Sequence, residues 1–424
     1  MAEPIIIAPA GDIVLDISHE DNPDHFLYRV HSPTLQQNSR YFEALLSDRF
    51  SEGSRVLAEL KGLNISEKYR SIAEAPLDAL PVVAISDVGK ISKVNTIKNL
   101  IGDFLRGLHG FDLAVASPPV SNLANLAVVA DRFDAIPHFA KYIERKKYIQ
   151  TLEAKTKGKV SPGITEERMR QKLLIGVLLD HAPWVTKYSK AVIMSDSVRW
   201  KPQAAEDPSA ALWWEIPRGL EDEMITRREY ILETINSLQA HFLKLYTSGE
   251  RQCKLGYDSS IQCDSFQLGE MVRFFIRLGT LRLQGTIYDS EAPPLYAGDI
   301  DRLLESLRQC SSYQIDRNHA HCGLRSRLLP LLDHIQNLLC LDAGSIDVGI
   351  CAHCWNINRG QYAWSEAKRP LIWSRSRLTS ATKGPISQGN RKERRISQNS
   401  CLNRHLVVRD MFMAVERDWT ASSY

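Results

Sequence analysis

The N-terminal part of the chain alternates between apolar and polar positions and then changes to a helical period. Apolar side chains recur at every second residue over 13–17 and again over 26–30, which is typical of half-buried strands. The polar run 22–24 between them, Asn-Pro-Asp, has the residues of a turn. Ser32 followed by Pro33 is a favoured helix start. The pattern therefore predicts a hairpin followed by an amphipathic helix.

The same domain is expected to continue to residue 147. A strand-like run covers 80–86, and apolar residues at helical spacing cover 94–108 and 120–139. Residues 53–79 between these runs have a weaker pattern and predict an insertion. We thus expect one domain over 11–147, preceded by a flexible leader over residues 1–10.

Beyond this domain the pattern predicts helices and then disorder. Residues 148–164, rich in Lys, Gly and Ser, indicate a linker. Residues 165–362 predict a mostly α-helical domain, with helices expected at 220–246, 266–279, 300–309 and 322–340. Residues 363–424 are polar and basic and bury too little apolar surface to offset the entropy of ordering, so we expect a mostly disordered basic tail. The predicted fold class is α+β, with a small sheet flanked by helices in the N-terminal domain.

Composition narrows the class of protein only modestly. The 424 residues are 44% hydrophobic with a formal net charge of +3, which is ordinary for a globular protein. Neither a signal peptide nor an apolar run long enough to span a membrane is recognisable, so we expect no membrane association. Eight cysteines without a secretory signal favour reduced thiols, and hence a cytoplasmic or nuclear location.

Several residues of the N-terminal domain, which we call the signature residues, follow one another at a distinctive spacing; they are Asp12, His31, Leu35, Ser39, Tyr41 and Phe42. The His109-Gly110 turn and the run Ala130-Asp131-Arg132-Phe133 follow in the later helices. This pattern resembles the BTB/POZ domains of fungal proteins.

The resemblance implies a protein that binds proteins and is not an enzyme. It implies homo- or hetero-dimerisation through the BTB domain and, most concretely, a substrate adaptor that joins a client to a cullin-type ubiquitin ligase. Phe50-Ser51-Glu52 is similar to the hydrophobic-x-acid element of cullin-binding members. The alternative is that Phe50 is a core residue and Glu52 a solvated one.

One departure from the family pattern concerns the residue after His31. Many members have Lys or Arg there, paired with the aspartate that corresponds to Asp12, and this chain has Ser32. A charged pocket for a corepressor is therefore not expected, and we expect Asp12 to cap the turn at Gly11 instead.

Two Cys/His pairs predict a metal site in the helical domain. Cys253 and Cys263 lie in loop-like sequence, and His319 and Cys322 form an H-x2-C pair before a helix. Four such ligands suit a closed, tetrahedral structural zinc. His321 could replace His319, and the alternative to a metal site is ordinary buried cysteines near a surface histidine.

A further C-x2-C pair, Cys351 and Cys354, has no second pair of that spacing. It could belong to a second metal site, contribute to the first, or consist of ordinary free thiols.

The tail carries a basic run that suggests another class of function. Arg391, Lys392, Arg394 and Arg395 could serve nuclear import or contact nucleic acid, and Ser397 follows in the pattern of a basic-directed kinase site. The corresponding hypothesis is a nuclear transcriptional regulator that uses the BTB domain for assembly and the tail for import or DNA contact. The alternative is a solvated charge run.

Common catalytic motifs are missing from the sequence. It contains no G-x-S-x-G, no G-x-x-x-x-G-K-[ST], no H-E-x-x-H and no G-x-G-x-x-G. We therefore expect no enzymatic activity, with an enzyme in the helical domain as the third hypothesis.

Overall fold

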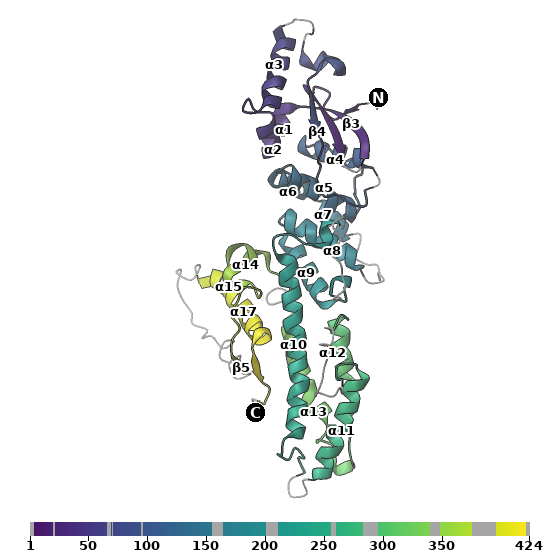
Figure 1. The fold of residues 1–424 in the computed structure, drawn as a ribbon, viewed down its shortest axis with the longest axis vertical. Helices are drawn as coiled ribbons and strands as arrows, with labels where there is room; N and C mark the ends of the chain where they lie inside the picture. Colours follow the sequence, from purple (N-terminus) through teal and green to yellow (C-terminus); the bar gives the residue numbers. More distant parts are fainter. Residues whose placement is uncertain are drawn as a thin grey trace, which may run out of the picture. The chain divides into compact units, whose positions relative to one another are not determined.

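The chain folds into two compact units (Figure 1). One comprises Met1–Val185 with Asp207–Pro217, and the other Thr186–Glu206 with Arg218–Tyr424. The predicted α+β class is confirmed at this level, since a small mixed sheet near the N-terminus is followed by helices. The computed structural model describes residues 4–19, 22–65, 69, 71–94, 96–154, 164–200, 211–255, 260–282, 296–339, 348–374 and 396–420.

The N-terminal unit contains a four-stranded sheet in the order β1-β3-β2-β4. Strands β2 and β3 form the predicted antiparallel hairpin, and β4 pairs with β2 in parallel. The apolar side chains at alternate positions of β2 are buried, as their period predicts. The strands are β1 (Ile5–Ile6), β2 (Ile13–His19), β3 (Asn22–Val30) and β4 (Val82–Ile85).

Two sequence-based expectations fail at the edges of this sheet. Ile5 and Ile6 pair with Tyr28 and Arg29, so the predicted leader contributes an edge strand. Asn22 pairs with His19, so β3 already begins where the turn was predicted. A strand of two residues is too short to show a period, and the strand–turn boundary is the weakest part of a pattern-based prediction.

The helix predicted after the hairpin is broken at Ser39. The backbone of Ser39 is extended, and its hydroxyl accepts a hydrogen bond from the N–H of Phe42 and donates one to the carbonyl of Phe133. The helices of this unit are α1 (Ser32–Asn38), α2 (Arg40–Leu45), α3 (Ser51–Ile65), α4 (Ile97–Leu108), α5 (Val120–Arg132), α6 (Ile136–Arg145), α7 (Tyr148–Ala154) and α8 (Glu166–Leu178).

The segment predicted as an insertion is packed onto the sheet. It contains α3 and the short helical turns η1 (Ile72–Glu74) and η2 (Leu77–Ala79). Val14 of the sheet, Ala75 and Leu80 form a buried cluster against which further apolar residues of the segment pack. The segment therefore belongs to the core of the N-terminal unit.

The predicted linker at 148–164 does not separate the two units. Its first part is α7, in which Tyr148, Ile149 and Leu152 are buried, while 155–163 lie outside the described residues. Helix α8 packs against α5 and η4 (Leu212–Trp214) and so extends the N-terminal unit beyond the predicted boundary. Burial of apolar side chains on α7 and α8 is the physical reason for this extension.

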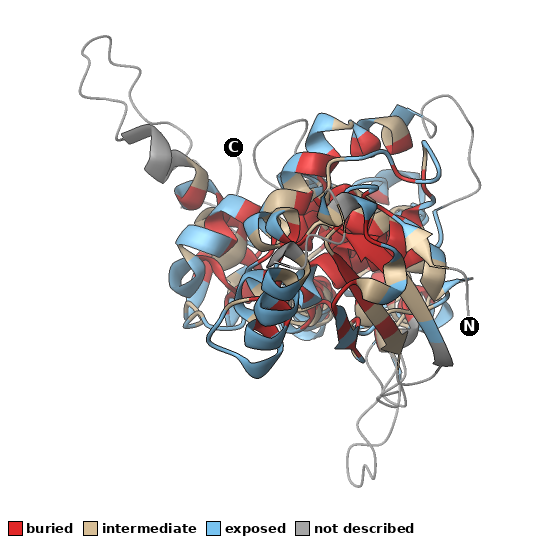
Figure 2. Ribbon diagram, turned by 90° about the horizontal axis from the view of Figure 1, so that it is seen from above, coloured by how far each residue is buried: buried red, intermediate tan, exposed pale blue. Residues whose placement is uncertain are grey.

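The C-terminal unit is built around the long helix α10 (Leu220–Thr247), whose apolar positions at helical spacing are buried. The predicted helices of this region are confirmed. Figure 2 shows that individual helices of the protein carry both buried and exposed residues, as amphipathic helices do. Its other elements are the end of α9 (Ala182–Met194), η3 (Val198–Trp200), α11 (Ile261–Arg277), α12 (Ile300–Arg308), η6 (Arg317–His319), α13 (Leu324–Leu339), α14 (Ala352–Ile357), α15 (Arg359–Tyr362), β5 (Ile372–Ser374), α17 (Ile396–Met413) and β6 (Glu416–Asp418).

The last described part of the chain differs from the predicted disordered tail. Residues 396–413 form α17, and β6 pairs in parallel with β5. Met411 and Phe412 of α17 are fully buried, and the Phe412 ring stacks on Trp364. These apolar residues are few among many basic ones, which is why composition predicted disorder. No helix in the described residues is long and apolar enough to cross a membrane.

Candidate metal centres and docking surface

Four predicted ligands form a compact cluster in the C-terminal unit, which we call the first cluster. Cys253, Cys263, His319 and Cys322 are all buried, and their ligand atoms lie within 4.8 Å of one another. His321 is exposed and outside the cluster, so the proposed replacement of His319 by His321 is wrong.

The spacing of these ligand atoms fits a tetrahedral zinc site. The sulfur of Cys253 lies 3.8 Å from that of Cys322 and 3.5 Å from Nδ1 of His319, and Cys322 sulfur lies 3.7 Å from the same nitrogen. Zn–S and Zn–N bonds at the tetrahedral angle place two sulfurs about 3.8 Å apart and a sulfur and nitrogen about 3.6 Å apart. These three ligands are therefore spaced to hold a metal ion, and Cys263 lies close enough to be the fourth.

Helix ends and short turns position the ligands of the first cluster. Ser260 caps α11 by accepting a hydrogen bond from the N–H of Cys263, 3.2 Å away. His319 ends η6, and its carbonyl accepts a hydrogen bond from the N–H of Cys322 just before α13. The backbone at Cys263, His319 and Cys322 is thus held by hydrogen bonds that need no metal.

Polar groups around the first cluster are placed to support metal-bound ligands. The backbone N–H of Lys254 donates to the sulfur of Cys322 over 3.4 Å. Oδ2 of Asp316 lies 3.8 Å from Nε2 of His319, the ring nitrogen that does not face the sulfurs. A carboxylate at the outer nitrogen and N–H donors at the sulfur are the usual surroundings of histidine and thiolate ligands.

The thiols of the first cluster differ in how readily they ionise. Burial disfavours the Cys253 thiolate, but the N–H groups of Ser260 and Leu255 and the neighbouring thiols lower its pKa to about 7. Burial, with the charges of Cys322 and Cys253 next in size, raises the pKa of Cys263 to about 12. Several thiolates cannot share this space unless a cation offsets their repulsion.

A second cluster in the same unit comprises Cys351, Cys354, Cys401 and His405, whose ligand atoms also lie within 4.8 Å of one another. The sulfurs of Cys354 and Cys401 are 3.8 Å apart, and the Cys401 sulfur lies 3.5 Å from Nε2 of His405. Cys354 and His405 are buried, whereas Cys351 and Cys401 are partly exposed. The C-x2-C pair thus belongs to a separate cluster and adds nothing to the first.

The sequence pattern indicated only two of the four residues of the second cluster, Cys351 and Cys354. Cys351 and Cys354 flank the start of α14, while Cys401 and His405 are four residues apart on α17. Residues at that spacing share one face of a helix. The C-x3-H spacing could have indicated the missing ligands, but it lies in a segment whose composition predicted no helix.

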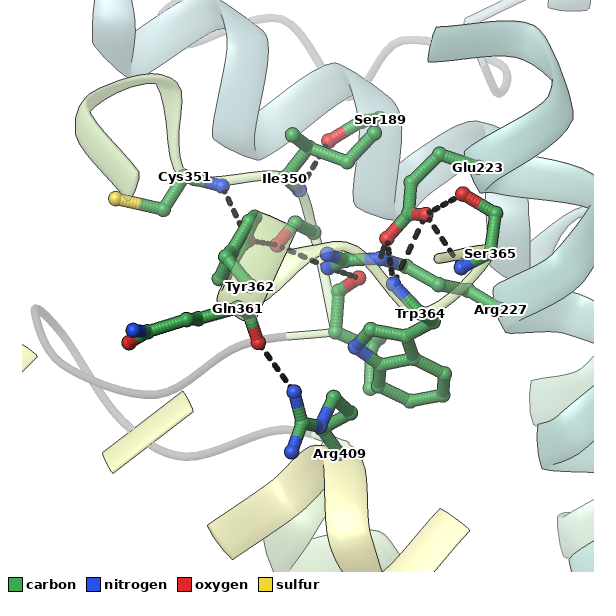
Figure 3. A network of polar contacts seen from close by, with 12 residues as sticks. Ser189, Glu223, Arg227, Ile350, Cys351, Gln361, Tyr362, Trp364, Ser365 and Arg409 are labelled. Atoms are coloured by element: carbon green, nitrogen blue, oxygen red, sulfur yellow. Dashed lines mark hydrogen bonds and ion pairs between the residues drawn. The ribbon is translucent and has the colours of Figure 1, made fainter. Parts of the chain in front are cut away.

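A buried polar network holds the segment that carries the C-x2-C pair (Figure 3). We call residues 348–365 the strap. Arg227 of α10 donates to the carbonyls of Val348 and Gly349 and forms a 2.7 Å ion pair with Glu223 one helical turn earlier. Both charged side chains are essentially inaccessible to solvent. The strap is therefore attached to α10 by charge-assisted hydrogen bonds.

The other end of the strap is held by Glu223. Its carboxylate accepts hydrogen bonds from the N–H groups of Trp364 and Ser365 and from the Ser365 hydroxyl (Figure 3). The Tyr362 hydroxyl accepts a 2.7 Å hydrogen bond from the N–H of Cys351, and the guanidinium of Arg227 lies over the Tyr362 ring. This network connects α10, through Tyr362, to Cys351 of the second cluster.

The signature residues of the N-terminal unit have structural partners. Asp12 accepts two 2.6 Å hydrogen bonds, from the N–H and from the hydroxyl of Ser32. The expected cap of the turn at Gly11 is therefore wrong, because this carboxylate serves the start of α1. Leu35 and Phe42 are fully buried, and Tyr41 and Phe42 both contact the ring of Phe133.

His31 is joined to the predicted His109-Gly110 turn. Its N–H donates to Nε2 of His109, and Nδ1 of His109 lies 2.8 Å from the carbonyl of Leu105. His109 must donate from Nδ1 and accept at Nε2, which requires the neutral ring. Burial, the largest influence, lowers the pKa of His109 and favours that form.

Phe50 and Glu52 lie at the surface where α3 begins. The Phe50 side chain is 52% exposed, so the alternative of a core phenylalanine is wrong. Glu52 is exposed in the first turn of α3. A Cβ at Gly53 would lie 1.8 Å from the Ser47 carbonyl oxygen, so the helix start can approach the preceding turn only with glycine here.

The predicted basic run receives no structural placement. Arg391, Lys392, Arg394 and Arg395 lie outside the described residues, and Ser397 lies in the first turn of α17 without a described side chain.

Comparisons of the chain with protein-family models, with curated proteins and with solved structures found no match.

Proposed function

We propose that this protein is a non-enzymatic interaction protein with a BTB/POZ-type docking unit at its N-terminus. In its most concrete form it is a substrate adaptor that binds a cullin-type ubiquitin ligase through this unit and holds a client through the C-terminal unit. The observation that carries the proposal is the exposed pair Phe50 and Glu52 at the start of α3.

Physical chemistry favours a docking role for this pair. An aromatic side chain that is 52% exposed gains free energy when a partner covers it, and a nearby carboxylate can remain at the polar rim of the interface. Leu57 is 37% exposed about two helical turns after Phe50 and extends the apolar surface. Gly53 fixes the start of this helix against the preceding turn, so the surface is presented by a rigid element.

A polar cavity in the N-terminal unit contains a serine and a histidine that each face a backbone carbonyl. It has a volume of about 330 Å³ and is lined by residues of α1, α2 and α6. Its serine, Ser39, donates its hydroxyl proton to the Phe133 carbonyl, and its histidine, His138, faces the Gly107 carbonyl. Neither group is placed to activate the other as a nucleophile–base pair.

We further propose that the first cluster binds a structural zinc ion that stabilises the client-holding unit. Three cysteines and one histidine are a ligand set that zinc favours, and four protein ligands leave no open position for a substrate. The zinc would supply folding energy to loops that carry few apolar side chains.

The docking proposal can be tested by binding of the purified full chain to the N-terminal region of a cullin. Phe50→Ala combined with Glu52→Ala should weaken binding about tenfold or more, because the exposed anchor and its rim charge are lost. Phe111→Ala is the matched control, since Phe111 is a 45% exposed aromatic outside α3. Equal binding by wild type and the double variant would refute the role of this surface. Absence of any wild-type binding would refute the adaptor proposal.

A further inference from the structure

We propose that the second cluster is a second zinc site, with Cys351, Cys354, Cys401 and His405 as its ligands, and that it fastens α17 to the strap. This inference does not depend on the docking proposal or on the first cluster. It assigns a role to two residues, Cys401 and His405, in a part of the chain that composition predicts to be disordered.

The geometry of the second cluster matches that of the first. The Cys354 and Cys401 sulfurs are 3.8 Å apart and the Cys401 sulfur is 3.5 Å from Nε2 of His405, which are the separations of ligands around a tetrahedral zinc. A donor set of three sulfurs and one imidazole favours zinc over magnesium or calcium, which prefer oxygen. Four protein donors fill the tetrahedral shell of zinc and leave no open position for a substrate, so the proposed role is structural.

One half of the site is preorganised by contacts that do not involve a metal. The N–H of Cys351 is held by the Tyr362 hydroxyl, and the carbonyls of Cys351 and Cys354 accept helical hydrogen bonds within α14. A Cβ at Gly349 would lie 2.3 Å from the Thr186 carbonyl oxygen, so the strap approaches α9 closely just before the first ligand. The C-x2-C pair is thus presented by a fixed backbone.

The other half of the site comes from α17. Its ligand Cys401 is 47 residues further along the chain than Cys354, with which it is in contact. The Thr234 hydroxyl contacts the Phe412 carbonyl, the Arg369 guanidinium donates to the Met413 carbonyl, and both contacts lie at the C-terminal end of α17. At its N-terminal half, the second cluster supplies the connection to the strap. Closing so long a loop costs entropy, which a metal bound to both halves can offset.

Zinc content gives the first test. The full chain purified under reducing conditions should carry two zinc ions, and Cys401→Ser and Cys263→Ser should each carry one. Cys310→Ser is the control and should retain both, since Cys310 is a buried cysteine outside the two clusters. A wild-type zinc content that Cys401→Ser leaves unchanged would overturn the second site, whereas loss in Cys401→Ser alone would leave only the second site supported.

Thiol alkylation provides a second test, whose main comparison uses the wild-type chain with and without zinc. Cys351 and Cys401 are partly exposed and should react with iodoacetamide about tenfold more slowly with zinc than after chelation, because bound zinc occupies their sulfurs. The same protection should persist in Cys263→Ser, which separates the two clusters. Equal alkylation rates with and without zinc, or a Cys354–Cys401 disulfide in the reduced preparation, would overturn the proposal.

Discussion

The two Cys/His clusters have the same ligand chemistry and different surroundings. In the first cluster all four ligands are buried, whereas in the second Cys351 and Cys401 are partly exposed. The first joins loops between neighbouring helices, and the second joins the strap to a helix far along the chain. The comparison teaches that a donor set determines which metal fits, while burial and connectivity determine how firmly that metal is held.

Metal removal should have the largest effect and should act on the C-terminal unit alone. Structural zinc contributes about 10–16 kcal/mol to folded zinc-binding peptides near neutral pH, so chelation should lower the unfolding temperature of the unit that contains both clusters. The N-terminal unit has no such cluster among its described residues and should keep its transition. Calorimetry with and without chelator measures both transitions.

The comparison also predicts an order of release. Zinc should leave the second cluster before the first, because water and chelator reach its partly exposed sulfurs directly. A colorimetric zinc indicator should therefore report two phases, and Cys401→Ser should lack the faster one. A single phase of zinc release that is identical in wild type and Cys401→Ser would contradict the prediction that the two clusters release zinc at different rates.

Glu223→Gln should weaken the second cluster and spare the first. The substitution leaves the buried Arg227 without its charge partner, and breaking such a pair costs about 3–5 kcal/mol. The substitution also weakens the attachment of the strap to α10 at Trp364 and Ser365, so we expect loss of zinc from Cys351 and Cys354 at lower chelator concentration. Zinc titration measures this change at each cluster.

The matched control for this substitution is Glu305→Gln, at an exposed position of α12. It should leave both clusters unchanged. Equal weakening of both clusters by Glu223→Gln would show that the ion pair supports the whole unit and not the strap in particular.

The sequence predicted well what depends on local pattern. The strand period at Ile13, the helix start at Ser32-Pro33 and the helical spacing of α10 are each visible within a few turns. The first cluster was also predictable, because both of its pairs contain recognised ligand types. The structure brings these four residues together as the prediction requires.

What the sequence could not show depends on contacts between distant segments. The break at Ser39 follows from a hydrogen bond to Phe133, and the edge strand at Ile5 requires β3 as its partner. Cys401 and His405 were missed because the many basic residues around them led to a prediction of disorder. The few apolar side chains of α17 that are buried were not recognised as a helical pattern. Burial of Phe412 against Trp364 helps to offset the conformational entropy lost when α17 becomes ordered. Composition alone predicts that this entropy cost exceeds the gain from burial.

Acidification should have the smallest effect on stability. It should lower the free energy of unfolding of the N-terminal unit through His109, independently of any metal ion. Burial lowers the pKa of His109 below its ordinary value of about 6.5, so the folded unit favours the neutral ring. Its contribution is present above pH 6.5 and is lost as the pH falls through the lowered pKa, because the unfolded chain binds the proton first. Losing the hydrogen bond from His31 costs about 1–3 kcal/mol.

Urea unfolding of wild type and His109→Gln between pH 7 and pH 5, with chelator present throughout, measures this contribution. The variant should show a flatter dependence of the N-terminal transition on pH. An equally steep dependence in both proteins would assign the effect to other groups.

The central claim is that this chain holds two metal ions at two separate clusters. Anomalous scattering from crystals of the full chain, collected on both sides of the zinc absorption edge, tests it most directly. The account predicts two peaks, one among Cys253, Cys263, His319 and Cys322 and one among Cys351, Cys354, Cys401 and His405. A single peak, or none, with the sulfurs of the empty cluster reduced and ordered, would contradict it.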